Sequence, residues 1–411
     1  MQFNMSTGTS SIIKVIGVGG GGSNAVNNMF EKGIIGVDFA VMNTDNQALF
    51  LSPVTTKVQL GPTLTEGRGA GSKPNIGREA CLESEDEIKK LFGDETKMVF
   101  VTAGMGGGTG TGAAPVIAKA ARELDILTVG IVTMPFTFEG RRRQKQGTEG
   151  LEELKKHVDT LIVISNDKLR EIHGNLSLTA AFSQADNILT TAAKSIAEII
   201  TVPGYVNVDF EDVNTVMRNS GVAIMGTATM DGEDRAKRAV EAALASPLLE
   251  DNDIRGAEHI LLNISSGSKE VTMDEIFEIT EFVQEEAGGS DLIWGNCFDE
   301  TLGEKIAVTV IATGFERNKD SKAFKGAVGQ KDRVVVSLDD EDNRSNMRSQ
   351  PTRPQASRPQ QDIETPKKKS ILDIGFEADH SQANTFEFDD VKESIQKFQR
   401  SRYSYDEPYI K

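Results

Sequence analysis

The stretch "GMGGGTGTG" at residues 104–112 contains six glycines in nine positions. It follows the apolar run "MVFVTA" at 98–103, which is typical of a buried strand, and leads into the helix-like segment 113–125. Glycine weakens both strands and helices, so a glycine-rich junction needs another reason. Bare backbone lets N–H groups approach an anion closely, and the N-terminus of the next helix adds partial positive charge. The stretch therefore predicts an anion-binding loop.

Strand-like and helix-like segments alternate on both sides of this loop. The apolar runs lie at 12–18, 37–43, 98–103, 126–134 and 160–165, with helix-like segments near 23–32, 77–92, 110–123 and 147–157. This alternation favours an α/β domain, a parallel sheet with helices on both faces. Ligands of such sheets bind at the carboxyl ends of the strands, which is where the glycine-rich loops of this sequence fall.

A long amphipathic helix is predicted at 178–201, where apolar residues recur at steps of three and four. It would span roughly 36 Å at about 1.5 Å per residue, the width of a small domain. A second α+β pattern follows, with strands near 221–230, 258–267, 291–299 and 304–315 and helices near 234–246 and 273–287. We therefore predict a nucleotide-binding domain at 12–177, a connecting helix at 178–202 and a smaller α+β domain at 203–315.

The two ends of the chain lack this pattern. Residues 1–11 are polar and are predicted to be disordered. Residues 316–370 are rich in Lys, Asp, Ser, Arg, Gln and Pro, which predicts a flexible linker. Residues 371–411 regain some apolar character, beginning with "ILDIGF" at 371–376. From composition alone this tail either orders on a partner or is inert.

Composition narrows the class of function. The 411 residues carry a net charge of −17, which argues against a general nucleic-acid-binding protein, because phosphate backbones attract basic surfaces. Two cysteines cannot build a disulfide framework. The sequence contains no signal-peptide pattern and no apolar run of about 18 residues, so we expect a cytoplasmic protein without a membrane span.

A second glycine-rich loop, "GVGGGGSNAV" at 17–26, follows the first strand. Gly17, Gly19 and Gly22 fit the G-x-G-x-x-G fingerprint, and Asp45 lies about 20 residues further on, where dinucleotide-binding domains place their ribose-binding acid. Taken alone, this pattern predicts an NAD-dependent dehydrogenase. Neither loop is followed by the Gly-Lys-Ser/Thr of a P-loop, so backbone amides rather than a lysine would hold phosphates.

Two glycine-rich loops at one sheet edge predict a ligand with several phosphates, which the dehydrogenase interpretation leaves unexplained. Thr109 and Thr111 add hydroxyl donors to the second loop without adding bulk. The sequence offers no well-placed histidine or lysine for hydride transfer. The two loops are also compatible with a scaffold that binds nucleotide for structure alone, or with two glycine-rich turns that hold no ligand.

Six motifs in order resemble the FtsZ family of bacterial tubulin homologues. They are "GVGGGGSNAV" at 17–26, "NTD" at 43–45, "GGGTGTG" at 106–112, "FEGRRR" at 138–143, "SNDKL" at 165–169 and "NVDFEDV" at 207–213. The resemblance covers about residues 12–315. It implies a tubulin-like fold with a Rossmann-like parallel-sheet domain that binds and hydrolyses GTP. It also implies head-to-tail protofilaments, with the chain itself as partner, and the division ring at midcell in bacterial cytokinesis.

The resemblance further implies which residues bind GTP or GDP. They are Gly20, Gly21, Gly22, Asn24, Asn43, Asp45, Gly69, Gly71, Gly104, Gly106, Gly107, Gly108, Thr109, Gly110, Thr111, Glu139, Arg143, Asn166, Phe182 and Asp186. Within this set the glycine-rich loops would hold the phosphates, Glu139 would bind the ribose hydroxyls, and Arg143 would reach ribose and phosphate. A solvated basic face is the alternative for Arg141–Arg143.

Guanine presents N1–H and N2–H₂ as donors, and a carboxylate accepts hydrogen bonds from both. Asp186 on the long helix is the candidate, with Asn166 reading the purine and Phe182 packing against the ring. The family has an Asx pair at this point, so either Asp186 or Asn187 faces the base. Two surface polar residues on an amphipathic helix are the plain alternative.

The motif "NVDFEDV" supplies candidate catalytic residues Asn207, Asp209 and Asp212. The two aspartates are three residues apart, on one face of a helical turn, where solvent-facing or helix-capping carboxylates are the alternative. The resemblance implies that this loop enters the nucleotide site of the next subunit. There the residues would orient the attacking water, and Asp209 and Asp212 would help hold Mg²⁺ against the phosphates. Such contacts are heterologous and give open filaments.

The family ends in a short peptide that docks on membrane-tethering and regulatory division proteins. The segment "ILDIGF" at 371–376 resembles the start of that peptide, but the chain continues to "SYDEPYIK" at 404–411. The sequence therefore leaves open which part of the tail docks partners.

Overall fold

The computed structural model describes residues 11–172, 174, 176–202, 204–206, 208–246 and 254–315 of the chain. Residues 1–10, the predicted linker 316–370 and the predicted tail 371–411 lie outside the described residues, as does the catalytic candidate Asn207. Among the described helices, none has the length and apolarity needed to cross a membrane.

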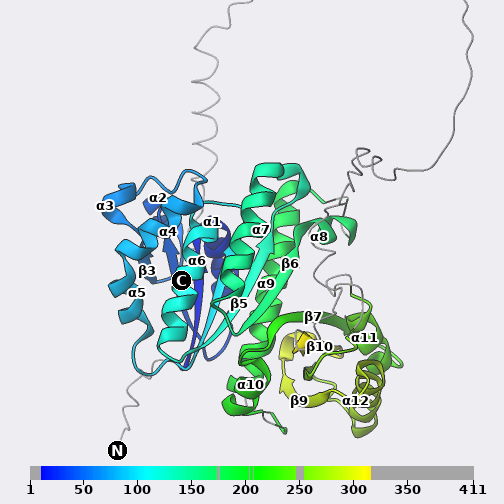
Figure 1. The fold of residues 1–411 in the computed structure, drawn as a ribbon. Helices are drawn as coiled ribbons and strands as arrows, with labels where there is room; N and C mark the ends of the chain where they lie inside the picture. Colours follow the sequence, from blue (N-terminus) through cyan, green and yellow to red (C-terminus); the bar gives the residue numbers. More distant parts are fainter. Residues whose placement is uncertain are drawn as a thin grey trace, which may run out of the picture. The chain divides into compact units, whose positions relative to one another are not determined.

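Ten strands in the described part of the chain form one mixed sheet in the order β3-β2-β1-β4-β5-β6-β7-β10-β8-β9 (Figure 1). The strands are β1 (Ile13–Val18), β2 (Asp38–Asn43), β3 (Thr56–Gln59), β4 (Met98–Gly104), β5 (Leu127–Met134), β6 (Thr160–Ser165), β7 (Gly221–Met230), β8 (His259–Ser266), β9 (Asp291–Phe298) and β10 (Ile306–Thr313). β1 to β7 pair in parallel, β10 pairs antiparallel with β7 and β8, and β8 pairs in parallel with β9. The strand order reverses direction between β1 and β4, which is where doubly wound sheets bind ligands.

The helices fill the connections between these strands. They are α1 (Gly19–Lys32), α2 (Asn46–Leu51), α3 (Pro62–Thr65), α4 (Pro74–Glu83), α5 (Glu85–Phe92), α6 (Thr109–Glu123), α7 (Arg141–Lys155), α8 (Asn166–Ile172), α9 (Leu178–Thr201), α10 (Phe210–Met217), α11 (Arg235–Leu244) and α12 (Met273–Ala287), with short 3₁₀ turns η1 (Thr137–Glu139) and η3 (Glu300–Leu302). The predicted alternation of strands and helices is confirmed, and the long helix has the predicted bounds. α9 begins where Ser177 caps it, by accepting a hydrogen bond from the Ala180 N–H.

One predicted helix, 77–92, is wrong as a single element. It is divided at Ser84, whose backbone leaves the helical region between α4 and α5. The Ser84 hydroxyl accepts a hydrogen bond from the Gly61 N–H at 3.0 Å and donates one to the Gln59 carbonyl at 3.3 Å. Serine competes for backbone hydrogen bonds in this way, and the apolar pattern of the helices gave no sign of it.

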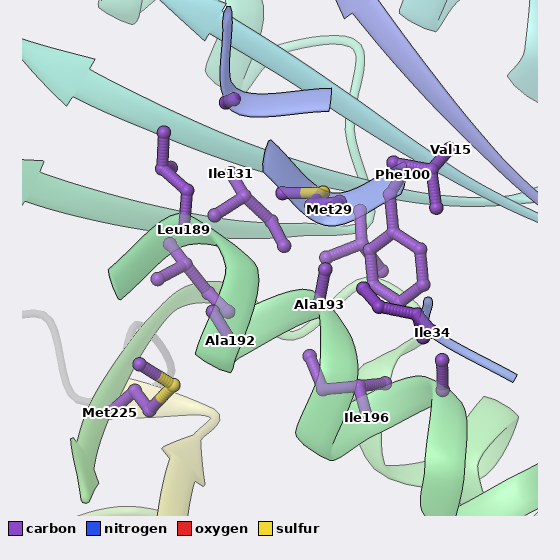
Figure 2. Packing of buried hydrophobic residues seen from close by; sticks show 14 of the residues in the cluster. Val15, Met29, Ile34, Phe100, Ile131, Leu189, Ala192, Ala193, Ile196 and Met225 are labelled. Carbon is purple, nitrogen blue, oxygen red and sulfur yellow. The ribbon is translucent and has the colours of Figure 1, made fainter. Parts of the chain in front are cut away.

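α9 packs against both halves of the sheet and joins their cores. Figure 2 shows Leu189, Ala192, Ala193 and Ile196 of this helix beside Val15, Met29, Phe100 and Ile131, with Met225 of β7 nearby. Small residues on α9 allow the helix to lie close to the sheet, and burial of this surface is the main stabilising term. The other face of the β1–β6 region is covered by a second core that includes residues of α4, α5, α6 and α7.

The sheet itself is continuous between the two predicted domains. Thr160–Ile162 of β6 pair in parallel with Gly221–Ala223 of β7. A third core, formed by α11 and α12 with β7, β8 and β10, covers the second half of the sheet. α9 and the β6–β7 pairing are therefore two separate connections between the nucleotide-binding half and the C-terminal half.

Candidate nucleotide-binding site

Two helices begin side by side at one edge of the sheet. α1 follows β1, α6 follows β4, and the register pairs Val18 with Ala103 at the ends of these strands. Neither helix has a side-chain cap or an acidic residue in its first turn. The first N–H groups of a helix have no partner within the helix, so both helices direct unpaired donors and positive dipole ends to the same edge. This arrangement suits a ligand with several phosphates.

Some loop glycines are required because backbones touch there. A Cβ on Gly19 would lie 2.7 Å from the Gly110 nitrogen, and one on Gly110 would lie 2.8 Å from the Gly104 carbonyl oxygen. A Cβ on Gly22 would overlap the Thr102 carbonyl oxygen. These glycines hold the two loops and strands together at a spacing that no other residue allows.

Other loop glycines face open space. A Cβ on Gly20 would meet no atom within 4 Å, and one on Gly107 would meet only the Gly104 carbonyl oxygen, at 4.0 Å. Gly20, Gly21 and Asn24 are exposed at the start of α1, whereas Gly22 is buried. We name the backbone of residues 19–22 and 106–110 the phosphate cradle, after the phosphates that the sequence predicts at these loops.

The second loop is held between two walls. A Cβ on Gly108 would lie 2.9 Å from the Ala70 Cβ and from the Lys73 nitrogen, in the loop that carries Gly69 and Gly71. Gly106, at φ 89°, lies against the carbonyl of Arg143 in the first turn of α7, where a Cβ would be 2.7 Å from the oxygen. The predicted site residues from four separate segments therefore meet at the cradle.

The "NTD" motif contacts the cradle through the hydroxyl group of Thr44. The Thr44 and Thr109 hydroxyl oxygens are 2.6 Å apart. Thr44 lies within the quoted motif but is not among the site residues predicted from the sequence. The Asn43 side chain accepts a hydrogen bond from the Asp45 N–H at 3.2 Å. Asp45 Oδ1 caps α2 by accepting from the N–H groups of Gln47 at 2.9 Å and Ala48 at 3.3 Å. Asp45 therefore has a capping role here that the dinucleotide fingerprint did not predict.

The two residues predicted at the ribose are paired with each other. Glu139 Oε2 accepts a hydrogen bond from Arg143 Nη1 at 2.6 Å, and Glu139 Oε1 accepts one from the Phe136 N–H at 2.9 Å. Arg142 Nη2 donates to the Ser72 carbonyl at 3.3 Å. All three arginines of the run are exposed, and Arg142 and Arg143 each make a hydrogen bond to a residue beside the cradle.

Asp186 and Asn187 have different surroundings. Asn187 Oδ1 accepts hydrogen bonds from Lys32 Nζ at 2.7 Å and from Asn28 Nδ2 at 3.4 Å, so this side chain is directed toward α1. The Asp186 carboxylate makes no hydrogen bond to any described residue and is half-buried. Burial raises its pKa from 3.8 to about 6. A half-buried carboxylate without a partner is suited to accept the donors of guanine.

The remaining predicted base contacts lie near the start of α8 and α9. Asn166 is 4% exposed, and its Oδ1 has no hydrogen-bond partner among the described residues. Phe182 is 40% exposed and meets Phe136 edge to face at 5.3 Å between ring centroids. The buried Thr111 hydroxyl in α6 is also unpaired within the described part of the chain. Asn166 Oδ1 and the Thr111 hydroxyl are therefore two polar groups beside the predicted site that have no partner among the described residues.

The predicted catalytic carboxylates are remote from this cradle. Asp209 and Asp212 are exposed and form a capping box at the start of α10, in which each accepts the other's backbone N–H, at 2.9 and 3.2 Å. The end of α9 lies roughly 22 Å along the helix axis beyond Asp186, at about 1.5 Å per residue. Among the described residues no group of three or more His, Cys, Asp or Glu side chains is arranged to hold a metal ion.

Comparison with known proteins identifies the class of this fold and site. Residues 12–174 match the model of the Tubulin/FtsZ family GTPase domain, and residues 221–316 match that of the FtsZ family C-terminal domain. The protein is a tubulin-like GTPase. Over 328 residues it is 50% identical to Cell division protein FtsZ of Porphyromonas gingivalis (strain ATCC BAA-308 / W83), covering 79% of this chain and 72% of the relative. The chain belongs to the FtsZ family.

Solved structures agree with this assignment. An FtsZ dimer from M. jannaschii matches with a TM-score of 0.71 and 42% identity, over 76% of this chain and 90% of that one. CetZ2 from Haloferax volcanii, a GTPγS-bound protofilament, matches with a TM-score of 0.65 and 21% identity, over 77% and 96% of the two chains, which shows the common fold. The predicted fold and GTPase activity are confirmed, and the dehydrogenase alternative is wrong.

Proposed function

We propose that this GTPase polymerises head-to-tail and that each active site is completed by the next subunit. One observation carries the proposal: the phosphate cradle and the exposed pair Asp209 and Asp212 lie toward opposite ends of α9. The pair follows the end of α9, whereas α1 begins at the cradle and reaches Asn187 in the middle of α9 only with its last turns, through Asn28 and Lys32. In a head-to-tail contact the start of α10 in one copy meets the cradle of its neighbour. Because this contact is heterologous, it repeats and produces an open filament.

Each subunit binds its own GTP through the cis part of the site. Unpaired N–H groups of α1 and α6 hold the phosphates, and Glu139 and Arg143 bind the ribose. Asp186 accepts the guanine donors, Asn166 supplies its unpaired Oδ1 to the purine, and Phe182 packs against the ring. Support for this assignment of the base is that Asn187 already binds α1.

The neighbouring subunit contributes the catalytic part. In the capping box Asp209 and Asp212 each use one carboxylate oxygen, which leaves the other oxygen to act on the neighbour's GTP. These carboxylates, together with Asn207, orient the attacking water. Mg²⁺ prefers one or two carboxylates together with substrate phosphates. The carboxylate oxygens of Asp209 and Asp212 that the capping box does not use, together with phosphate oxygens, fit this preference. Bound there, the ion would neutralise phosphate charge.

The cellular role follows from the family. A 50% identical relative is a cell division protein. We propose that filaments of this chain form the division ring at midcell in the cytoplasm, and that residues 371–411 bind membrane-tethering and regulatory division proteins. Cosedimentation of labelled peptides 371–384 and 398–411 with purified partner proteins would decide which part of the tail docks.

GTP turnover per subunit measured against protein concentration tests the shared site. We expect almost no turnover below a threshold concentration and a steep rise above it, at the concentration at which GTP-dependent polymer first sediments. A subunit with a self-contained site would instead give a constant rate per subunit at all concentrations. That result would contradict the shared site while leaving GTP binding by the cradle intact.

A further inference from the structure

The loop that leads to the catalytic carboxylates rests on three consecutive residues of β9. This loop, residues 202–208, connects α9 to α10, and within it we describe Val202, 204–206 and Val208. A Cβ on Gly295 of β9 would lie 3.0 Å from Ile199 Cγ1 and 3.1 Å from Val208 Cγ2. Cys297 Sγ donates to the Glu198 carbonyl at 3.7 Å. β9 therefore contacts both ends of the loop.

The central residue, Asn296, makes the closest contacts. Its Oδ1 accepts a hydrogen bond from the Val206 N–H at 2.9 Å, and its own N–H donates to the Val206 carbonyl at 3.3 Å. On the other side of the same residue, a Cβ on Gly204 would overlap the Asn296 carbonyl oxygen. Asn296 thus holds both the N–H and the carbonyl of Val206, and its own carbonyl leaves room only for glycine at position 204.

The exposed side chains of the loop do little to fix it. Tyr205 is 88% exposed and Val206 is exposed, so neither side chain is anchored in a core, whereas Val208 is buried in the core that includes α9. Before Val208, the two hydrogen bonds with Asn296 hold the Val206 backbone. Val206 lies three residues before Asp209, the N-cap of α10. Holding the Val206 backbone therefore restricts where the capping-box carboxylates can point.

We propose that Asn296 is a positioning residue for GTP hydrolysis, because it clamps Val206 so that Asp209 and Asp212 reach the neighbouring subunit's GTP in the productive arrangement. The inference rests on the proposed shared site. Asn296 belongs to the C-terminal half of the sheet, through the pairing of β9 with β8. The clamp therefore ties the position of the catalytic carboxylates to that half of the molecule as well as to α9.

The test compares Asn296→Ala and Asn296→Asp in the full chain. The alanine variant removes the acceptor for the Val206 N–H, whereas aspartate retains one. Ser290→Ala is the matched control, since it removes another side-chain-to-backbone hydrogen bond, from Ser290 to the Ala257 carbonyl at 2.6 Å, before the opposite end of β9. Three quantities are measured for each: affinity for a fluorescent GTP analogue, sedimentable polymer, and phosphate release per polymerised subunit.

For Asn296→Ala we expect unchanged nucleotide affinity, polymer in a slowly hydrolysed GTP analogue, and phosphate release per polymerised subunit lowered about ten- to a hundredfold, since small misplacements of catalytic groups have effects of this size. Asn296→Asp should release phosphate at close to the rate of the unmodified chain. Ser290→Ala should be less stable but should release phosphate at an unchanged rate per polymerised subunit.

Two results would overturn the proposal. One is an unchanged rate per polymerised subunit in Asn296→Ala. The other is an equal loss of rate in Asn296→Ala and Ser290→Ala, because that would reflect general destabilisation. If the unmodified chain shows a rate per subunit that is independent of concentration, the shared site itself fails, and Asn296 has no carboxylates in a neighbour's site to position.

Discussion

In our proposal the phosphate cradle and the start of α10 act on the same nucleotide, and the two are built differently. The cradle consists of backbone N–H groups at two helix starts, and glycines such as Gly19 and Gly22 let its backbones touch. The start of α10 presents two exposed side-chain carboxylates, whose local task is to cap a helix. The cradle is complete within one chain, whereas in our proposal the carboxylates act only on a neighbour.

This difference has a consequence for substitutions. Changes in the cradle act through steric overlap and therefore affect folding and binding together, unless the substituted glycine faces open space. Changes at α10 alter chemistry and leave the GTP-binding half of the same chain untouched. Substitutions that separate folding, binding and chemistry therefore test whether the two regions have different roles.

The largest effect is expected for Asp212→Asn. The amide can still accept the Asp209 N–H and preserve the capping box, but it removes the charge that orients water. We expect GTP turnover to fall about a hundredfold or more, with unchanged GTP affinity, because positioned acid–base groups contribute at least that much. Phosphate release and equilibrium binding measure the two quantities.

Glu211→Gln is the control for that substitution. Glu211 is an exposed carboxylate in the same turn of α10, and its Oε2 accepts a hydrogen bond from Asn214 Nδ2 at 3.1 Å. We expect at most a small change in turnover. If Glu211→Gln lowered GTP turnover as much as Asp212→Asn, turnover would depend on the net charge of this turn and not on the specific pair Asp209 and Asp212.

The next effect separates two glycines of the same helix turn. Gly22→Ala should lower the free energy of unfolding by about 3 kcal/mol, because the new methyl group overlaps the Thr102 carbonyl. Gly20→Ala meets no atom, so its unfolding free energy should stay unchanged or rise by up to about 1 kcal/mol. GTP affinity should nevertheless fall about ten- to a hundredfold in Gly20→Ala, because the methyl group would occupy the open side of the cradle and keep a phosphate from hydrogen-bonding distance of the backbone N–H groups.

Chemical denaturation without nucleotide and binding titration check this pair. The assignment of Gly20 to the open side of the cradle would be wrong if Gly20→Ala bound GTP as tightly as the unmodified chain.

The smallest effect is the pH dependence of guanine binding. The Asp186 carboxylate has a pKa of about 6 and must be ionised to accept both guanine donors. GTP affinity should therefore fall about tenfold between pH 7 and pH 5, because ionisation falls by about that factor. In Asp186→Asn the part of this fall in GTP affinity that comes from Asp186 should be absent, while the part that comes from titration of the nucleotide phosphates remains. An identical pH profile in both proteins would exclude Asp186 as the base-reading group.

The same raised pKa has the opposite effect on the stability of the free protein. The folded state binds the Asp186 proton more tightly than the unfolded chain, so this group's stabilising contribution is fully present below pH 3.8 and is lost as pH rises through about 6. Asp186→Asn should remove that part of the pH dependence of the melting temperature.

Much of the fold and the ligand class could be predicted from the sequence. The glycine-rich loops at 17–26 and 104–112 each follow a strand and predict an anion-binding backbone. The segment that forms α9 has the periodicity of a long amphipathic helix. The role of Asp45 was harder to foresee, because the fingerprint spacing does not reveal that this side chain caps α2. The break at Ser84 was missed because it depends on Gln59 and Gly61, which lie more than 20 residues away.

Most local elements, the anion-binding chemistry and the family could be predicted from the sequence, because these depend on residues that are close together in the chain. Folding, by contrast, brings Lys32 and Asn28 of α1 to the Asn187 side chain, while the Asp186 carboxylate has no hydrogen-bond partner among the described residues. It also brings Asn296 to Val206, 90 residues earlier in the chain. The direction of a side chain is set by its packing partners, and those partners are brought together by folding.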